Sequence, residues 1–411
     1  MGFEKDRKMG IVLFDNKQNC CGCGACQTIC PHQAITMEPD EQGFVYPKIN
    51  PRDCVECGAC IRVCPLRSPE LGTVKHTYAA AICDKDQIQK AASGGIFSAA
   101  AISILEDGGA VFGAELTFSQ GHADVHHIMI EDKQELWKLQ GSKYVQSAVG
   151  DTYRQAKCCL EQGRKVLYSG TPCQIAGLKK YLRKEYSNLY CIDLICHGVP
   201  SQSFFDGYIQ QLKKRYRGEV VSYRFRDKTK GWGSNILLEI NDGKKTRKVY
   251  KKAMAQSYGA FFLRSKIYRD SCYCCPFAGP RRPGDLTIGD YWGIAQEHPE
   301  LKNNPDYAEQ NGVSCLLVNT EKGAELMRRM GNSIHVTPSE IAKVAKHNAQ
   351  LKSPSVKPEE RQVILQLYQN QGYAGVEQYF RKRYFAQTAA YTIYDKMPRK
   401  LGYWLKTVLK G

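Results

Sequence analysis

Apolar residues in the middle of the chain fall into short runs that are separated by polar turns. Residues 164–169 and 189–195 are two such runs, and each is followed by a turn and a stretch of helical composition, 174–182 and 204–216. Alternating strands and helices are typical of parallel strands joined by crossover helices. Ligand sites in such sheets form just beyond the carboxyl ends of the strands. We therefore expect an α/β domain with a site at these two turns.

Elements of the same kind are expected on either side of this region. Further strands are expected at 78–83, 110–116, 125–130 and 234–240, and further helices at 98–106, 361–368 and 376–385. After Pro398, apolar residues recur at helical spacing among lysines and arginines. Such a segment either lies on an anionic membrane as an amphipathic helix or docks on the protein's own core. Both interpretations stay open.

Closely spaced cysteines precede this domain. Residues 20–31 contain the pattern C-x2-C-x2-C-x3-C-P, and residues 54–65 repeat it. The spacing is typical of a bacterial-type ferredoxin domain with two 4Fe–4S clusters, in which the fourth cysteine of each run binds the neighbouring cluster. It assigns one cluster to Cys20, Cys23, Cys26 and Cys64, and the other to Cys54, Cys57, Cys60 and Cys30. A zinc site has no use for the third and fourth cysteines. Cys21 falls outside the spacing and is interpreted as a bystander.

Composition narrows the setting in which the protein works. The chain has 411 residues and 19 cysteines, with no apolar run of 18 residues and no apolar segment typical of a signal peptide near Met1. Cluster motifs without a signal peptide indicate a reducing cytoplasm, in an organism that lives with little oxygen. The formal charge is +17, but no nucleic-acid-reading motif accompanies it. An acidic electron carrier or the anionic cofactors explain the charge without nucleic acid.

Two other groups of residues attract attention. His122, His126 and His127 resemble metal ligands, but neighbouring residues on a strand face opposite ways, so we expect an exposed strand instead. Residues 225–233 form a basic, aromatic turn, for which a solvated hairpin is expected. The alternative is a loop that closes over an anionic substrate, with Arg226 or Lys228 as its anchor.

Six short motifs follow one another along the chain: SGGIF at 93–97, GSKYVQS at 141–147, GTPCQ at 170–174, CHGVPS at 196–201, CYCCP at 272–276 and GDLTIGDYWG at 284–293. Together, over residues 16–319, they resemble the beta subunit family of coenzyme F420 hydrogenases and dehydrogenases. That family is in turn similar to the electron-input subunit of archaeal deazaflavin dehydrogenase complexes and to chloroplast hydroxymethyl-chlorophyll reductase. The resemblance identifies a family but no particular substrate.

The resemblance implies one FAD beside a third 4Fe–4S cluster. Its ligands would be Cys173, Cys196, Cys272 and Cys275, with Cys274 leaving an ambiguity of one residue. The free amides at the start of the helix after residue 95 suit the FAD pyrophosphate. The residues implied to contact FAD are Ser93, Gly94, Gly95, Ile96, Gly141, Ser142, Lys143, Tyr144, Gln146 and Ser147. Two implied catalytic residues are His197, which would transfer a proton, and Lys143, which would offer charge to a phosphate or to the flavin.

The implied fold class is α+β/α/β. A two-cluster ferredoxin-like domain (15–68) would precede a flavoprotein domain in two parts (73–155 and 156–335, the second with the third cluster) and a helical, basic tail (336–411). The implied function is an oxidoreductase that passes electrons between clusters and FAD, with hydride transfer to or from a small-molecule substrate such as coenzyme F420. The alternative is a non-catalytic electron-transfer subunit of a larger redox complex. Expected partners are ferredoxin or another redox protein and a small-molecule substrate, and contact of the tail with the inner membrane face is one of the two interpretations left open above.

Overall fold

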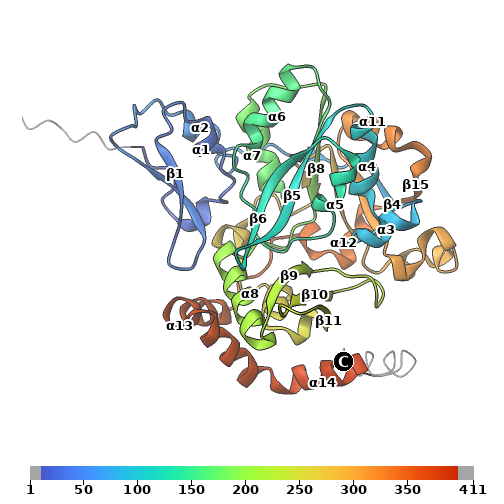
Figure 1. Ribbon diagram of the computed structural model, residues 1–411. Coiled ribbons are helices and arrows are strands. Elements are labelled where there is room, and N and C mark those ends of the chain that lie inside the picture. The colour runs from blue at the N-terminus through green and yellow to red at the C-terminus, as the bar shows by residue number, and fades with distance from the viewer. Residues whose placement is uncertain (1–10, 397–411) are drawn as a thin grey trace, which may run out of the picture.

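A computed structural model describes residues 11–396 (Figure 1). The chain starts with a small unit of two short helices and one antiparallel hairpin: α1 (Ala25–Ile29), α2 (Ala59–Arg62), β1 (Ile35–Pro39) and β2 (Val45–Ile49). Gly24 and Gly58 cap the two helices with φ of 76° and 70°. Glycine adopts this left-handed conformation at little cost. Each cysteine loop therefore turns sharply into its helix.

An eight-stranded mixed sheet lies at the centre, in the order β15-β4-β14-β13-β8-β7-β5-β6. Its strands are β4 (His76–Ile82), β5 (Ala110–Ser119), β6 (His122–Ile130), β7 (Val166–Gly170), β8 (Leu189–Leu194), β13 (Leu286–Asp290), β14 (Ser314–Val318) and β15 (Ile334–Ser339). The four inner strands β5, β7, β8 and β13 run parallel to one another. Antiparallel strands extend the sheet at both edges. The expected parallel pair is thus confirmed, within a sheet that is mixed as a whole.

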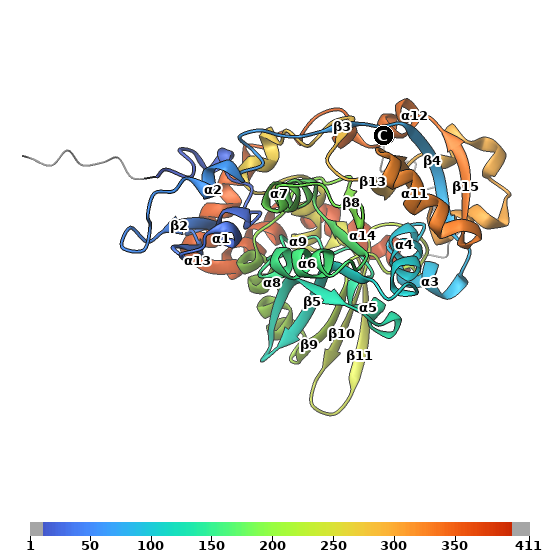
Figure 2. The ribbon, with the colours of Figure 1, turned by 90° about the horizontal axis from the view of Figure 1, so that it is seen from above.

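Helices cover both faces of this sheet (Figure 2). On one face, α4 (Ile96–Leu105) packs on β4, β5 and β7 and on α11 (Glu321–Met330). On the other face, α6 (Thr152–Glu161) and α7 (Pro172–Leu182) pack on β7, and α1 of the N-terminal unit packs on both of these helices. Ala25 and Val63 of the N-terminal unit share the apolar core beneath α6 and α7. The N-terminal unit is therefore packed onto the sheet domain through apolar contacts.

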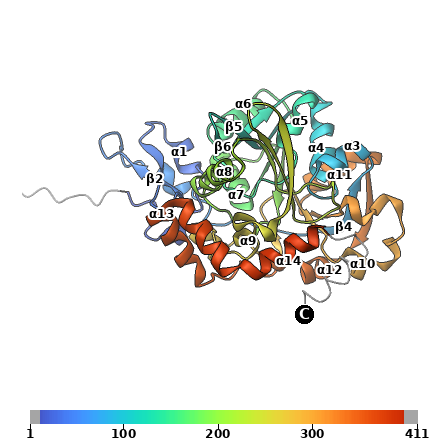
Figure 3. The same ribbon diagram turned by 60° about the horizontal axis from the view of Figure 1, so that its bottom comes forward.

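A second sheet and the C-terminal helices complete the fold. The sheet has the order β11-β10-β9 and consists of β9 (Glu219–Arg224), β10 (Asn235–Asn241) and β11 (Thr246–Lys252). Two helices flank it, α8 (Gln202–Tyr216) and α9 (Ser257–Leu263). The two expected C-terminal helices, 361–368 and 376–385, correspond to the two halves of α13 (Glu360–Arg383), which is kinked at Gly372. A further helix, α14 (Phe385–Lys396), follows it. Figure 3 shows both running across this side of the molecule, and α13 packs on α8 and α9.

Membrane contact by the tail was expected from residues after Pro398, which lie outside the described residues. Within residues 11–396, no helix combines the length and the apolar character that a membrane span requires.

A buried ion pair joins the end of β8 to the loop before β13. Asp193 and Arg282 are both almost completely buried, and Nη2 of Arg282 lies 2.6 Å from Oδ1 of Asp193. The other carboxylate oxygen accepts a hydrogen bond from the amide of Gly284 at 2.7 Å. Arg282 also donates to the carbonyl oxygens of Phe277 and Leu194. The pair therefore fixes the turn after β8 relative to the cysteine-rich loop that ends just before Phe277.

Removing one partner of this pair should destabilise the protein strongly. Asp193→Ala leaves the buried guanidinium without its counter-ion, which costs about 3–5 kcal/mol of unfolding free energy. Glu106→Ala is the matched control, because Glu106 pairs with Lys133 at the surface and such pairs contribute about 0–1 kcal/mol. The measurement is urea unfolding of anaerobically purified protein, followed by near-UV circular dichroism. Equal unfolding midpoints for the two variants would contradict this role of Asp193.

Candidate functional site

Three cavities in the protein are lined by cysteine side chains. They have volumes of about 410, 330 and 560 Å³ and are called the first, second and third cavity in that order. Apolar side chains and backbone make up most of the remaining lining.

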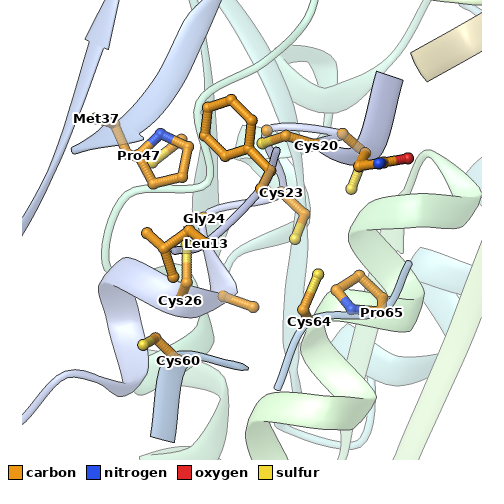
Figure 4. A pocket seen from close by; sticks show the side chains of 15 residues that line it. Leu13, Cys20, Cys23, Gly24, Cys26, Met37, Pro47, Cys60, Cys64 and Pro65 are labelled. Atoms are coloured by element: carbon orange, nitrogen blue, oxygen red, sulfur yellow. The ribbon is translucent and has the colours of Figure 1, made fainter. Parts of the chain in front are cut away.

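The first cavity lies between the two cysteine motifs (Figure 4). It is lined by all four cysteines expected for one cluster, namely Cys20, Cys23, Cys26 and Cys64. Figure 4 shows their sulfur atoms arranged around the space, with Cys60 farther away at its margin. The exchange of the fourth cysteine between the two motifs is thus visible in the geometry, because Cys64 comes from the second motif.

The second cavity is formed by the other expected set, Cys30, Cys54, Cys57 and Cys60. Cys57 is exposed, and Val55 beside it is 59% exposed. The second cavity therefore lies closest to the surface at this end of the molecule.

The third cavity is built from three separate turns of the sheet domain. Cys173 lies in the first turn of α7, just after β7, and Cys196 follows β8, so both lie beyond the carboxyl ends of neighbouring parallel strands. Cys272 and Cys275 reach the same cavity from the cysteine-rich loop. Cys274 does not line it: this thiol is exposed, and its sulfur lies 3.8 Å from the carbonyl oxygen of Gln18. The one-residue ambiguity is thus resolved geometrically in favour of Cys272 and Cys275 as lining residues.

The chemistry of these cavities suits iron–sulfur clusters. Burial raises the pKa of Cys26, Cys196 and Cys275 to about 12, so these thiols keep their protons until a metal displaces them. Among residues 11–396, no group of three or more His, Cys, Asp or Glu side chains is arranged to hold a single metal ion. The thiols surround a volume instead of converging on one point. Four thiolate donors around a volume are what a 4Fe–4S core requires.

Two cysteines are shared between cavities and join all three into a row. Cys60 lines the first and second cavities, and Cys21 lines the first and third. The Cys21 thiol is buried, and its pKa is raised well above the usual range beside the thiols of Cys173 and Cys23. Cys21, interpreted as a bystander of the ligand spacing, thus lies where the first and third cavities meet.

The residues expected to hold the FAD pyrophosphate lie in the loop between α3 (Lys85–Lys90) and α4. Gly95, with φ of 81°, caps α4, and the helix begins at Ile96. The amide of Gly94 donates to Oγ of Ser314, while Oγ of Ser93 donates to the carbonyl oxygen of Val313. A Cβ atom at Gly94 would lie 2.4 Å from the carbonyl oxygen of Ala80. Glycine is therefore needed here for close packing on the sheet, whatever else the loop binds.

The second expected flavin strip, residues 141–147, approaches the first. Gln140, just before it, donates to Oγ of Ser98 on α4 at 2.9 Å. Lys143 donates to the carbonyl oxygens of Lys138 and Gln140, which leaves the strip tightly folded around its amine. Gly141 and Ser142 lie at the start of this strip, where Gly141 is exposed and has φ of 77°. Gln140 therefore holds the start of the strip beside α4.

The second half of the strip turns towards the cysteine cavities. Nε2 of Gln146 donates to the carbonyl oxygen of Cys21 at 2.9 Å. The backbone amide of Gln146 donates to the carbonyl oxygen of Pro200. Oγ of Ser147 donates to Nδ1 of His127 at 2.9 Å. Gln146 thus contacts the first cysteine loop, which the sequence did not indicate.

Two buried amines stand near these strips. Burial lowers the pKa of Lys143 to about 7 and the pKa of Lys228 to about 7, in the second case with help from the charge of Arg226. Nζ of Lys228 donates to the carbonyl oxygens of Ile88 and Ser93, both at 2.6 Å. Neither amine forms a salt bridge with any carboxylate of the described residues. Each amine therefore donates to two backbone carbonyl oxygens and not to a carboxylate.

Residues 225–233 are not the solvated hairpin that was expected. Arg226 and Lys228 are buried, and Arg226 forms a bidentate pair with Asp290, with distances of 2.7 and 3.1 Å. Arg226 also donates to the hydroxyl of Tyr144 and lies over the ring of Trp292, which stacks on Trp232. Asp290 and Trp292 belong to the GDYWG motif, so this motif was the available signal. With its guanidinium occupied in this way, Arg226 organises the site instead of projecting into solvent.

His197 lies between the Arg226–Asp290 pair and the third cavity. His197 lines the third cavity and is exposed, while its carbonyl oxygen accepts a hydrogen bond from Ser355. Desolvation by the surrounding chain lowers the pKa of His197, with opposing contributions from Asp290 and Arg226. The imidazole is therefore mainly neutral at neutral pH, as a proton acceptor needs to be.

The other histidines do not converge on one ion. His122 pairs with Asp206 and His126 with Asp124. His126 and His127 face opposite ways, as expected of neighbours on a strand. His127 is the buried one: it stacks on Tyr168, and its Nε2 donates to the carbonyl oxygen of Ser169. Burial lowers its pKa to about 4, so this ring is a neutral part of the core.

Three family models match the chain. Residues 19–67 match the 4Fe–4S dicluster domain, residues 77–152 match the N-terminal part of the coenzyme F420 hydrogenase/dehydrogenase beta subunit, and residues 163–343 match its C terminus. A solved chain from the F420-reducing NiFe hydrogenase complex of Methanosarcina barkeri is similar at 16% identity and a TM-score of 0.45, over 74% of this chain and 95% of that one. No curated protein matches the chain. The chain belongs to the coenzyme F420 hydrogenase/dehydrogenase beta subunit family and carries an N-terminal 4Fe–4S dicluster domain.

Proposed function

We propose that this protein is an FAD-dependent iron–sulfur oxidoreductase that exchanges electrons between a redox partner and a small-molecule substrate. The observation that carries the proposal is the row of three cysteine-lined cavities, joined by Cys60 and Cys21. Clusters transfer single electrons, whereas a flavin also transfers hydride, so a chain that combines them connects the two kinds of chemistry. The division into 15–68, 73–155, 156–335 and 336–411 is part of the proposal.

The order of the cavities supports a path for electrons along the molecule. The second cavity, with exposed Cys57 and Val55, is the accessible end and suits contact with ferredoxin or another redox protein. The third cavity lies at the carboxyl ends of β7 and β8, inside the sheet domain. Electrons would therefore pass between the surface and this sheet edge through the first cavity. Either direction of flow is compatible with the row.

The proposed place for FAD is the region near α4. The loop 93–95 and the strip 141–147 approach each other through Gln140 and Ser98, and two amines without carboxylate partners among the described residues flank them. FAD bound here would supply two-electron chemistry. Lys143 and Lys228 would balance the phosphate charge, and Tyr144, stacked on Phe262, would hold the strip in place.

At the proposed reaction site, different side chains have different roles. The Arg226–Asp290 pair and the stacked Trp232 and Trp292 form a rigid wall that excludes water. His197, with its lowered pKa, would accept or return a proton at its imidazole next to the third cavity. Family membership favours a deazaflavin such as coenzyme F420 as one candidate substrate. It equally favours work as a subunit beside partner proteins, in which case the chemistry would lie on the partner.

Iron analysis tests the three clusters together. Anaerobically purified protein should contain about twelve irons and twelve acid-labile sulfides per chain, four of each per cluster. Cys275→Ser should lose about four irons, because Cys275 lines the third cavity. Cys274→Ser is the matched control and should keep all of them, since that thiol points away from the cavity. Eight irons in the unmodified protein, or equal losses in the two variants, would refute the third cluster.

FAD binding should depend on pH through Lys143. Its pKa is about 7 without an anion, and a nearby phosphate favours the charged amine, so binding above pH 7 takes up a proton. The affinity of deflavinated protein for FAD should therefore fall as pH rises from 7 to 9, and should level off below 7. In Lys143→Met the slope of the logarithm of the FAD affinity against pH should be smaller by about one proton. The measurement is a fluorescence titration of FAD at several pH values.

Lys138→Met is the control for this titration. Lys138 lies in the same segment but pairs with Glu135 near the surface, so its removal should leave the pH slope unchanged. Equal slopes for unmodified protein and Lys143→Met, or recovery of FMN instead of FAD on extraction, would contradict the proposed flavin site.

A further inference from the structure

Four arginine side chains are almost fully buried in the sheet domain and its neighbours. Three of them are neutralised by carboxylates, in the pairs Arg226–Asp290, Arg282–Asp193 and Arg361–Asp270. The fourth is Arg269, which has no exposed surface and no carboxylate partner within residues 11–396. A buried charge without a counter-ion costs several kcal/mol, so proteins seldom retain one without compensation.

The guanidinium of Arg269 reaches out of the sheet domain and contacts the first cysteine loop. Its Nε donates to the carbonyl oxygen of Cys20 at 2.8 Å, and Nη2 lies 3.8 Å from the sulfur of the same residue. Nη2 also donates to the carbonyl oxygen of Val45 at 2.7 Å, and Nη1 donates to Oε1 of Gln146 at 3.0 Å. The group lies over the ring of Tyr46 at 4.1 Å.

The first cysteine loop is shaped to admit this guanidinium. Gly22 has φ of 66°, and a Cβ atom there would lie 2.9 Å from Cζ of Arg269. A side chain at this position would thus collide with the guanidinium. The backbone of the loop and the arginine therefore meet at the closest possible approach, directly beside the first cavity.

All the hydrogen-bond acceptors around Arg269 are neutral. Carbonyl and amide oxygens satisfy its donors but do not cancel its charge. The ionisable groups that face it are the hydroxyl of Tyr46 and the thiols of Cys20 and Cys21, together with Cys272 and Cys173 of the third cavity. Cys20 is the nearest of the cysteines that line the first cavity. A cluster bound there, held by four thiolates, is a net anion and supplies the missing counter-charge.

We propose that Arg269 is the internal counter-ion of the first cluster and raises its reduction potential. The proposal rests on the part of the proposed function that places a cluster on Cys20, Cys23, Cys26 and Cys64. Addition of one electron converts the core from the 2+ to the 1+ state, and no bond forms or breaks. The charge of the whole cluster becomes more negative by one unit, so the adjacent guanidinium stabilises the reduced state more than the oxidised one.

This arrangement also couples electron transfer to domain packing. Arg269 belongs to the sheet domain, whereas the first cavity belongs to the N-terminal unit. The first cluster therefore acquires its higher potential only while the two parts are packed together. Arg269 acts here as a positioning residue of the electron path, since it contacts a ligand-bearing loop and no substrate.

Redox titration of the anaerobic full-length protein, followed by electron paramagnetic resonance, tests the proposal. In Arg269→Gln the midpoint potential of the first cluster should become more negative, with the second cluster unchanged. Arg269→Lys keeps the charge and should give a potential close to that of the unmodified protein. Because the site is buried, the shift should be the same at low and at high salt. An unchanged potential in Arg269→Gln with full iron content would overturn the proposal.

Arg62→Gln is the matched control. Arg62 also donates to a cysteine carbonyl oxygen, that of Cys57, at 3.0 Å, but it is exposed to water. Its removal should leave every midpoint potential unchanged, because solvent screens the charge. A shift as large as that of Arg269→Gln would show that any nearby arginine has this effect, and would refute a specific role for Arg269.

Loss of iron is also informative. If Arg269→Gln loses about four irons and Arg269→Lys keeps them, the charge is needed to hold the cluster, which supports the proposal. Loss of iron in both variants would assign Arg269 a purely structural role and overturn it. Failure of the proposed function is distinguishable: absence of flavin or of the third cluster in the unmodified protein would leave the first cluster and its potential available to this test.

Discussion

The packing of the first cysteine loop against the sheet domain is the constraint on which the rest of the structure depends. Within a few residues, Cys21 meets Cys173, Gly22 admits Arg269, and Gln146 caps the loop's carbonyl oxygens. These contacts bring an independently encoded motif to the carboxyl ends of β7 and β8. A row of cavities instead of two separate sites results from this one junction.

Much of this architecture could be predicted from the sequence because it is local. The spacing of the two cysteine motifs determines which thiols share a loop, and all eight line the two cavities as expected. The strand, turn and helix pattern placed Cys173 and Cys196 at neighbouring strand ends, and β7 and β8 are parallel neighbours. The antiparallel edges of the sheet were not predicted, since the order of strands depends on contacts distant in the sequence.

The burial and the partners of charged side chains were predicted least well, because a buried and an exposed arginine look the same in a sequence. The turn 225–233 has the composition of a solvated hairpin, yet Asp290, more than 60 positions away, pairs with Arg226 and draws the turn inward. Arg269 reaches Cys20 across 249 positions. Only the position of Arg269, three residues before Cys272, could have drawn attention to it. The GDYWG motif signalled Asp290 as important but not what it binds.

Burial changes along the row of cavities in a way that makes such charges necessary. The second cavity is open at Cys57, so water can stabilise the added electron of a reduced cluster. The cysteines of the first and third cavities are half-buried or buried, and desolvation raises the pKa of Cys26 and Cys196, so their surroundings oppose any increase in negative charge. Without compensation, an electron would be most stable at the surface and would not move inward. A fixed buried cation between the two inner cavities offsets this cost, and the packing of two domains places it there.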